Sequence, residues 1–272
     1  MSLNKQPLHN VPLAFLDVET TGLRPDLGHR VVEIAVLQTQ GTEKGREFST
    51  LINPQRPVDP GAARVNGISD DMVANAPTFA QILPQLQDLL VGRVLVAHNA
   101  PFDLKFLHAE YSIAKTPFAP EAVLDTLKLA RRQYHFYSNS LGNIAKTLRI
   151  RTPNAHRALG DVLTTYAVFR RFSGDLTRKN RPLVSDWIRM QGGVVWRAPS
   201  TASMLADDHP IQIALSQSRK VEIRYQSGRY ESRRVIEPLT LNGNYLVAFC
   251  HLRGEQRTFR LDRIKNAELV NE

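Results

Sequence analysis

Two carboxylates, Asp17 and Glu19, stand two residues apart near the end of an apolar run over residues 12–18 that predicts a buried strand. Side chains alternate along a strand, so both carboxylates should point to one face. Their repulsion would be relieved by a hard divalent cation such as Mg²⁺ or Mn²⁺, which prefers carboxylate oxygens. The Thr20-Thr21-Gly22 segment follows, with amides and hydroxyls that could hold a phosphate. Solvated carboxylate pairs are common at strand ends, so this pair alone decides nothing.

Two further features indicate a functional site only when they are considered together with Asp17 and Glu19. Asp103 follows the short apolar strand 94–97 and would lie in the first turn of a helix, where an acid also simply favours the helix dipole. His156 and Asp161 are five residues apart, which on a helix separates their side chains by about 140°. They can converge only if His156 lies in the loop before the helix, and the proline within 152–154 makes such a loop plausible.

Taken in order, Asp17, Glu19, Asp103, His156 and Asp161 resemble the DEDDh exonuclease family, which includes the epsilon proofreading subunit of the replicative polymerase. The resemblance is carried by segments 15–23, 98–103 and 156–161, with weaker similarity at 65–68 and 124–127, and it covers roughly residues 10–172. Val162 departs from the family pattern, which often has a small residue there. This departure should leave the chemistry intact.

The resemblance implies a ribonuclease-H-like mixed sheet with flanking helices and a metal-dependent 3′→5′ exonuclease that releases nucleoside 5′-monophosphates. Asp17, Glu19, Asp103 and Asp161 would hold two divalent cations, Mg²⁺ or Mn²⁺, that clamp the attacking and leaving oxygens. His156 would be the general base, since an ordinary histidine pKa suits neutral pH. Contacts to the substrate strand are expected from Thr20, Thr21, Gly22, Leu23, Asn66, Gly67, Ile68, His98, Asn99 and Phe102.

The elements that must position these residues follow from hydrophobic periodicity. Strands are expected at 12–18, about 30–40, 45–52 and 94–97, and helices at 78–90, 102–109, 122–133, 139–148 and 157–172. Strands first, and then helices alternating with strands, predict an α/β domain with a mixed sheet over residues 10–175.

A second domain is expected after a linker at 176–210. Residues 211–218 predict a short helix, and the alternating stretches 221–225, 245–251 and 257–264 predict strands separated by glycine-containing turns. The sequence therefore predicts a small all-β domain over residues 211–272.

Residues 219–270 resemble the WYL domain, a small SH3/Sm-like β-barrel of bacterial regulators, although Asn244 replaces the name-giving tryptophan. The resemblance is carried by segments 221–225, 234–238, 244–246 and 257–264. It implies that basic residues bind nucleic acid or a nucleotide-like ligand, and the candidates are Arg224, Arg234, Arg257, Arg260 and Arg263. Arg260 could instead pair structurally with Asp262 on the same strand face. The domain could also dock a protein partner.

Charge and composition fit a nucleic-acid enzyme without requiring one. The 272 residues carry a net charge of +9, which suggests a polyanionic partner or merely a soluble surface. The excess is greater in residues 170–272 than in 1–169. No apolar run is long enough for a transmembrane helix, and we expect neither a signal peptide nor membrane association. Cys250 is the only cysteine, so no intrachain disulfide can form, and we expect a cytoplasmic setting with Cys250 in a core strand.

Three functions remain open from the sequence. The first is a 3′→5′ exonuclease acting on DNA with a free 3′ end, in repair or proofreading-like trimming. The second is an RNA exonuclease with the same motifs. The third is a ligand-responsive nucleic-acid-binding regulator with an inactive nuclease domain, which the presence of all five catalytic-type residues argues against.

Overall fold

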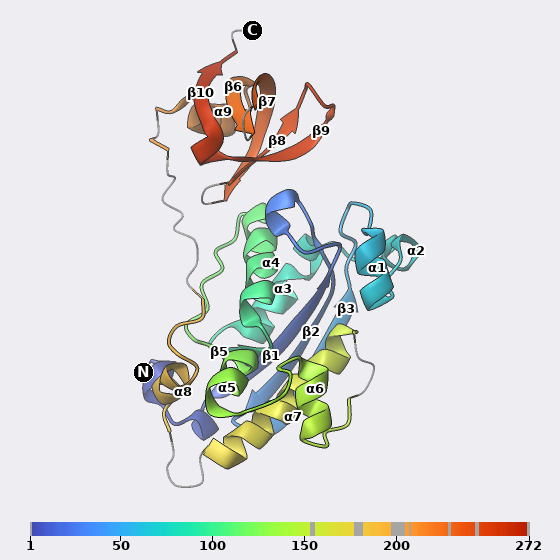
Figure 1. The fold of residues 1–272 in the computed structure, drawn as a ribbon, viewed down its shortest axis with the longest axis vertical. Coiled ribbons are helices and arrows are strands. Elements are labelled where there is room, and N and C mark those ends of the chain that lie inside the picture. Colours follow the sequence, from blue (N-terminus) through green and yellow to red (C-terminus); the bar gives the residue numbers. More distant parts are fainter. Residues whose placement is uncertain are drawn as a thin grey trace. The chain divides into compact units, whose positions relative to one another are not determined.

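The chain divides into two compact units in the computed structural model (Figure 1). The structure describes residues 2–152, 156–176, 182–196, 205–206, 208–227, 230–242 and 245–270. Over these residues, no helix is both long enough and apolar enough to span a membrane.

The first unit is built on a five-stranded mixed sheet with the order β3-β2-β1-β4-β5. Its strands are β1 Pro12–Thr20, β2 Val31–Gln40, β3 Glu43–Leu51, β4 Val94–Ala97 and β5 Val123–Asp125. The strands β1, β2 and β3 pair antiparallel, whereas β4 pairs parallel with both β1 and β5. The mixed sheet predicted from the order of strands and helices is confirmed.

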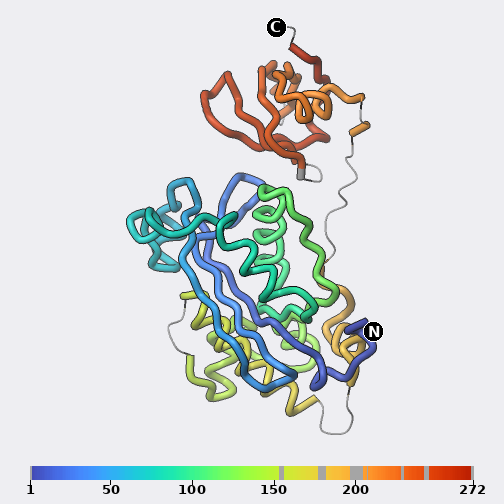
Figure 2. Tube along the Cα trace, turned by 180° about the vertical axis from the view of Figure 1, so that it is seen from behind, coloured from blue at the N-terminus to red at the C-terminus, as the bar shows by residue number. Residues whose placement is uncertain are grey.

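Helices cover both faces of this sheet (Figure 1 and Figure 2). They are α1 Pro60–Asn66, α2 Asp70–Val73, α3 Phe79–Leu90, α4 Ala100–Ile113, α5 Thr126–Gln133, α6 Leu141–Thr147, α7 Ala158–Leu176 and α8 Val184–Met190. Short 3₁₀ turns lie at Leu3–Lys5, Leu8–Asn10 and Pro25–Leu27. The α3 and α4 helices pack on one face of the sheet, and α5 to α8 pack on the other.

Alternation along β1 assigns its side chains to these two cores. Leu13 and Phe15 pack with α7, whereas Ala14, Leu16 and Val18 pack with α3 and α4. The strand is buried on both faces, which explains its nearly continuous apolar sequence. The odd-numbered positions that follow Phe15 therefore face α7.

The first unit differs from the sequence prediction in two segments. Residues 123–125, predicted as the start of a helix, form β5 instead. The helix α5 starts only at Thr126, because the Asp125 carboxylate accepts hydrogen bonds from the Leu127 and Lys128 amides and caps it. Residues 184–190, predicted as linker, form α8. Val184 and Trp187 are fully buried in the core that α5, α6 and α7 form with the sheet. A stretch of seven residues is too short for its hydrophobic periodicity to predict this contact. The short helices α1 and α2 were not predicted either.

The second unit is a five-stranded antiparallel sheet with the order β10-β6-β7-β8-β9, packed against α9 Pro210–Gln217. Its strands are β6 Val221–Ser227, β7 Tyr230–Asn242, β8 Tyr245–Cys250, β9 Glu255–Arg260 and β10 Ile264–Leu269. The strand predicted at 257–264 is broken by a 3₁₀ turn at Leu261–Arg263, and β7 was not predicted as a strand. Cys250 is fully buried in the core, as expected. Asn244 lies outside the described residues.

Candidate active site

Three carboxylates from two distant segments meet where β1 packs on α7. Asp17 and Glu19 continue the β1 face on which Phe15 contacts Phe169 of α7 at 5.4 Å between ring centroids. Asp161 lies in the first turn of α7. One carboxylate oxygen from each of the three lies within 4.8 Å of the other two, and all three side chains are partly accessible. The strand alternation inferred from the sequence thus brings both β1 carboxylates to one face.

Asp103 approaches the same strand from the opposite side. It lies in the first turn of α4 and is 2% exposed. Its Oδ1 accepts a hydrogen bond of 3.1 Å from the backbone N–H of Val18, between the two β1 carboxylates. A left-handed Asn99 (φ 68°) and Pro101 in the first turn start α4 at the place that allows this contact.

Burial and mutual repulsion raise the pKa values of these carboxyls. Burial raises the pKa of Asp17 well above its ordinary value, and the charges of Asp103, Asp161 and Glu19 add to the effect. Burial, with the Asp161 charge, raises the pKa of Glu19 to about 7, although a hydrogen bond from Asn66 opposes it. Burial also raises the pKa values of Asp103 and Asp161.

Among the described residues, no lysine or arginine balances this negative charge by direct pairing. Within the described ranges, none of the four carboxylates forms an ion pair with a lysine or arginine; the nearby Arg157 pairs with Glu33 instead. Closely packed carboxylates without a protein cation are a donor set that suits hard divalent cations. The residues present therefore fit a site for Mg²⁺ or Mn²⁺.

His156 lies in the loop before α7, as its spacing from Asp161 required. Its φ of 62° is in the left-handed region, and the helix begins two residues later at Ala158. The backbone of His156 hydrogen-bonds the Asp161 carboxylate, and the His156 charge lowers the pKa of Asp161 against the effect of burial. The imidazole is exposed beside the acidic cluster. Pro153 and Asn154, used to predict this loop, lie outside the described residues.

The start of α7 is fixed by Glu33, which the sequence analysis did not single out. Glu33 lies directly across from Glu19 in the β1–β2 register and is 3% exposed. The Arg157 guanidinium donates to both Glu33 oxygens at 2.7–3.2 Å, and the Ala158 amide donates to Oε2 at 2.9 Å. A charged residue inside the otherwise apolar run of β2 was the signal that could have found it.

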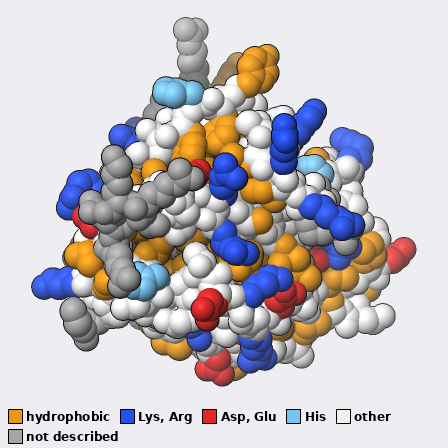
Figure 3. Space-filling model, turned by 90° about the horizontal axis from the view of Figure 1, so that it is seen from below, with side chains coloured by type: hydrophobic (Ala, Val, Ile, Leu, Met, Phe, Trp, Pro, Cys, Tyr) orange, Lys and Arg blue, Asp and Glu red, His pale blue; other side chains and the backbone are white. Residues whose placement is uncertain are grey.

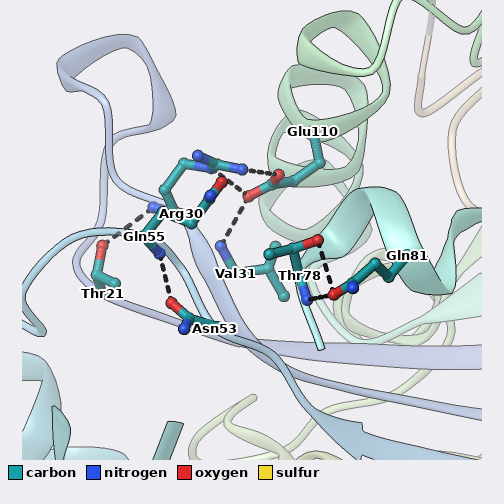
Figure 4. A network of polar contacts seen from close by, with 8 residues as sticks. All are labelled: Thr21, Arg30, Val31, Asn53, Gln55, Thr78, Gln81 and Glu110. Atoms are coloured by element: carbon teal, nitrogen blue, oxygen red, sulfur yellow. Dashed lines mark hydrogen bonds and ion pairs between the residues drawn. The ribbon is translucent and has the colours of Figure 1, made fainter. Parts of the chain in front are cut away.

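The threonines after Glu19 bind the protein's own backbone. Thr20 Oγ1 donates to the Gly22 carbonyl at 2.6 Å, and Thr21 Oγ1 accepts from the Arg30 amide at 3.0 Å. Arg30 in turn forms a bidentate ion pair with Glu110 of α4, whose carboxylate also accepts from the Val31 amide (Figure 4). These contacts close the end of β1 against β2 and α4.

Among the predicted nucleotide contacts at residues 66–68, some side chains are buried within the unit and others are open to the surface. Asn66 donates to the Thr20 carbonyl at 3.3 Å and accepts from the Ile68 amide at 3.0 Å. Ile68 is fully buried in a small core with Val32, so its side chain is not on the surface. Gly67 has open space where a side chain would begin, and Leu23 is 77% exposed.

The predicted contacts at residues 98–102 are also partly structural. The His98 ring is bonded at both nitrogens, to Thr126 Oγ1 at 2.9 Å and to the Asn139 carbonyl at 3.1 Å. Burial lowers the pKa of His98 to about 4, so the ring is neutral at pH 7. Asn99 has an exposed side chain, and its backbone N–H donates to the buried Asp125 carboxylate. The sequence analysis did not assign Asp125 a role in the site. Phe102 is half-buried.

The arginines proposed in the second unit are mostly engaged. Arg224 pairs with Glu231, Arg257 with Glu255 and Arg260 with Asp262. The Arg260–Asp262 pair is bidentate at 2.6–3.0 Å, which matches the structural alternative considered from the sequence.

The other two arginines differ from these three. Arg234 lies over the rings of Tyr225 and Phe259, with its guanidinium carbon 5.9 Å from each centroid. Arg263 is exposed and forms no ion pair within the described part of the unit.

Comparison with known proteins gives two family matches. Residues 14–169 match the family described as Exonuclease, and residues 209–269 match the WYL domain. The DNA polymerase III subunit epsilon of Treponema pallidum is 35% identical over 165 residues, which cover 59% of this chain and 75% of the relative. The DNA polymerase III subunit epsilon-like protein of Rhodobacter capsulatus is 37% identical over 175 residues, but this match spans 62% of this chain and only 25% of that protein.

Solved structures share the fold of the first unit. Exonuclease X in complex with 5′ overhanging duplex DNA is 28% identical, with a TM-score of 0.52 over 66% of this chain and 99% of that chain. E. coli exonuclease I in complex with an oligonucleotide has a TM-score of 0.56 at 18% identity, over 88% of this chain and 55% of that chain. The second likeness shows the fold alone.

Proposed function

Because the chain belongs to the exonuclease family, we propose that it is a metal-dependent 3′→5′ exonuclease that removes nucleoside 5′-monophosphates from DNA, in repair or proofreading-like trimming. The observation that carries this proposal is the cluster of Asp17, Glu19 and Asp161, whose oxygens lie within 4.8 Å of one another without a lysine or arginine partner among the residues described. Burial that raises carboxyl pKa values makes such a cluster costly unless cations are bound.

The four carboxylates, including Asp103, would hold two divalent cations. Bound cations supply charge neutralisation, polarise the scissile phosphate and lower the pKa of the attacking water. Asp103 is oriented by the Val18 amide, so only part of its carboxylate remains for this role. The anchored start of α7 holds Asp161 toward β1.

His156 is the general base of the proposed reaction. It removes a proton from the attacking water as the oxygen bonds to phosphorus, and the bond from phosphorus to the 3′ oxygen breaks. The freed 3′ oxygen takes up a proton and becomes the new strand end. The left-handed backbone of His156 and its bond to Asp161 support this role, since they hold the exposed ring next to the carboxylates.

DNA is the proposed substrate because the relatives and one structural neighbour point to it. The relatives named above are polymerase III epsilon proteins, and the exonuclease X structure holds a duplex DNA. We assign the WYL unit a supporting role in binding nucleic acid or a nucleotide-like ligand, through Arg234 and Arg263, since the other three arginines have acidic partners.

Digestion of end-labelled strands tests this function. Single-stranded DNA and RNA of equal sequence, labelled at either end, are incubated with the protein in Mg²⁺, Mn²⁺ or EDTA. We expect early mononucleotide release from 3′-labelled DNA, a ladder from 5′-labelled DNA and no product in EDTA. Labelled mononucleotide appearing first from the 5′ end, or cleavage that persists in EDTA, would refute the proposal. Faster digestion of RNA would reassign the substrate.

A further inference from the structure

Within residues 1–169, the positive charge is concentrated in one stretch. Residues 126–152 contain no aspartate or glutamate. They contain six basic residues, which are Lys128, Arg131, Arg132, Lys146, Arg149 and Arg151. The remaining residues of 1–169 carry more acidic than basic side chains. Within residues 1–169, this cationic segment consists of α5, the loop 134–140, α6 and the residues that follow α6, and it could bind a polyanion.

This segment is bonded directly to the loop that begins α4. The ring of His98 bridges Thr126 at the start of α5 and the carbonyl of Asn139 in the loop 134–140. The amide of the next residue, Asn99, donates to Asp125 at the end of β5. Asp103 follows one turn later and lies close enough to Asp125 to feel its charge. The loop 134–140 and α5 are thus held beside the acidic cluster.

Polar side chains of α5 reach two different parts of the first unit. Arg131 lies close enough to His98, and Lys128 to Asp125, for their charges to act on those groups. Arg132 instead packs against Gly192 after α8, and Gln133 donates to the Met190 carbonyl on the same far side. Arg131 and Arg132 are successive residues of α5, so their side chains diverge by about 100° and reach different neighbours.

Tyr137 projects from a loop whose other aromatic residues are anchored. The ring of Tyr134 stacks on Phe172 of α7 at 4.3 Å, and Phe136 stacks on Tyr134 at 5.4 Å. The side chain of Tyr137 is 108% exposed, so it contributes nothing to the core. An aromatic ring held outward on an anchored loop can bind an unpaired base by stacking.

The cations on this face also lack acidic partners. Within the described residues, Lys128 and Arg131 form no ion pair, in contrast to Arg224, Arg257 and Arg260 of the second unit. On the face of the molecule seen in Figure 3, many lysine and arginine side chains lie at the surface, with several aspartate and glutamate side chains among them. A cation that is not held in an ion pair is available to contact a phosphate.

We propose that the surface formed by α5 and the loop 134–140 binds the single strand upstream of its 3′ end, and we call this surface the strand platform. Lys128 and Arg131 contact phosphates, and Tyr137 stacks on one unpaired base. This assignment rests on the proposed exonuclease function, because it supplies the strand whose end reaches the acidic cluster. It predicts a preference for single-stranded over blunt duplex substrates near the site.

Binding of a fluorescent single-stranded oligonucleotide to the full chain in EDTA tests the platform without turnover. Tyr137→Ala should weaken binding by roughly 5- to 150-fold, and Tyr137→Phe should restore it, since stacking needs only the ring. Affinity for a blunt duplex should change less. Arg131→Gln should lower the slope of log affinity against log salt by about 0.7, whereas the matched Arg132→Gln should leave the slope unchanged.

Equal effects of the two arginine substitutions, or unchanged binding by Tyr137→Ala, would overturn the platform. Failure of the exonuclease function itself is read separately, from hydrolysis of a p-nitrophenyl ester of a nucleoside 5′-monophosphate by the wild-type protein in Mg²⁺. This small substrate has no upstream strand. If the wild type hydrolyses this ester but the variants bind the strand as the wild type does, the platform is rejected and the exonuclease function is retained. If the variants bind the strand more weakly but the wild type does not hydrolyse the ester, the platform is retained and the exonuclease function is rejected.

Discussion

The guanidinium of Arg157 and the carboxylate of Glu33 form a bidentate contact that fixes the first turn of α7 to β2. His156 precedes this contact in the chain, and Asp161 follows it. The same carboxylate accepts the Ala158 amide, so it also caps the helix. One ion pair thus holds both the proposed general base and one proposed metal ligand in place.

Removing Arg157 should destabilise the protein. Arg157→Met leaves the nearly buried Glu33 without its cation, and we expect a loss of about 1–3 kcal/mol in the free energy of unfolding, measured in urea. Arg171→Met is the matched control, because Arg171 pairs with Asp175 on the exposed side of the same helix. That change should cost less than about 1 kcal/mol. Equal losses in the two variants would contradict the anchoring role.

The acidic cluster should weaken the metal-free protein. The raised pKa of Asp17 means that the folded state holds this proton more tightly than the unfolded chain, so stability from this group falls as pH rises above its ordinary value. In EDTA at pH 7, Asp17→Asn should therefore raise the free energy of unfolding by on the order of 1 kcal/mol.

Divalent metal should reverse the order of stability of the wild type and Asp17→Asn. Mg²⁺ should raise the Tm of the wild-type protein but have little effect on Asp17→Asn, because ligand binding stabilises only the form that binds it. The Asp88→Asn variant, which alters an exposed acid on α3, should respond to Mg²⁺ as the wild type does. A wild-type Tm that Mg²⁺ does not change would count against the metal site.

His98 should make the fold sensitive to mild acid. Its folded pKa of about 4 lies below its ordinary value of 6.5, so the unfolded chain binds the proton first as pH falls. This contribution to stability is intact above about pH 6.5 and is lost progressively toward pH 4. His98→Gln removes the titration. Between pH 7 and 5, the wild type should lose about 1–2 kcal/mol more than the variant in urea unfolding. Parallel losses would show that His98 does not titrate in this way.

Loss of the proposed general base should appear in the rate and in its pH profile. His156→Ala should lower the rate of mononucleotide release by about 10²–10⁴ in single-turnover reactions. It should also change the shape of the pH–rate profile, in which protonation of the cluster carboxylates remains. His9→Ala, which alters an exposed histidine far along the chain, should preserve both the rate and the profile. A His156→Ala profile that keeps the wild-type shape would assign the base to another group.

The local part of the site could be read from the sequence, because it depends on neighbours in the chain. Alternation in β1 predicted the common face of Asp17 and Glu19, and helix geometry predicted that His156 precedes α7. The mixed sheet followed from the order of elements. These features need only the period of a strand or a helix.

The supporting contacts could not be read in the same way, because they join segments far apart in the chain. Glu33 meets Arg157 only when α7 packs against β2, and Asp125 meets Asn99 only when β4 and β5 pair. The sequence predicted that His98 contacts the substrate, but Thr126 and Asn139 occupy both nitrogens of its ring. The α8 helix is held by Trp187, which is buried in a core that residues far away in the sequence form.

The most direct test of the account is the release of the labelled 3′-terminal nucleotide from single-stranded DNA in Mg²⁺, by the wild type and by Asp161→Asn in parallel. Circular dichroism of both proteins first establishes that the variant is folded. The account predicts rapid mononucleotide release by the wild type and release at least about 10²-fold slower by the variant. Equal rates, or no release by a folded, metal-supplied wild-type protein, would contradict it.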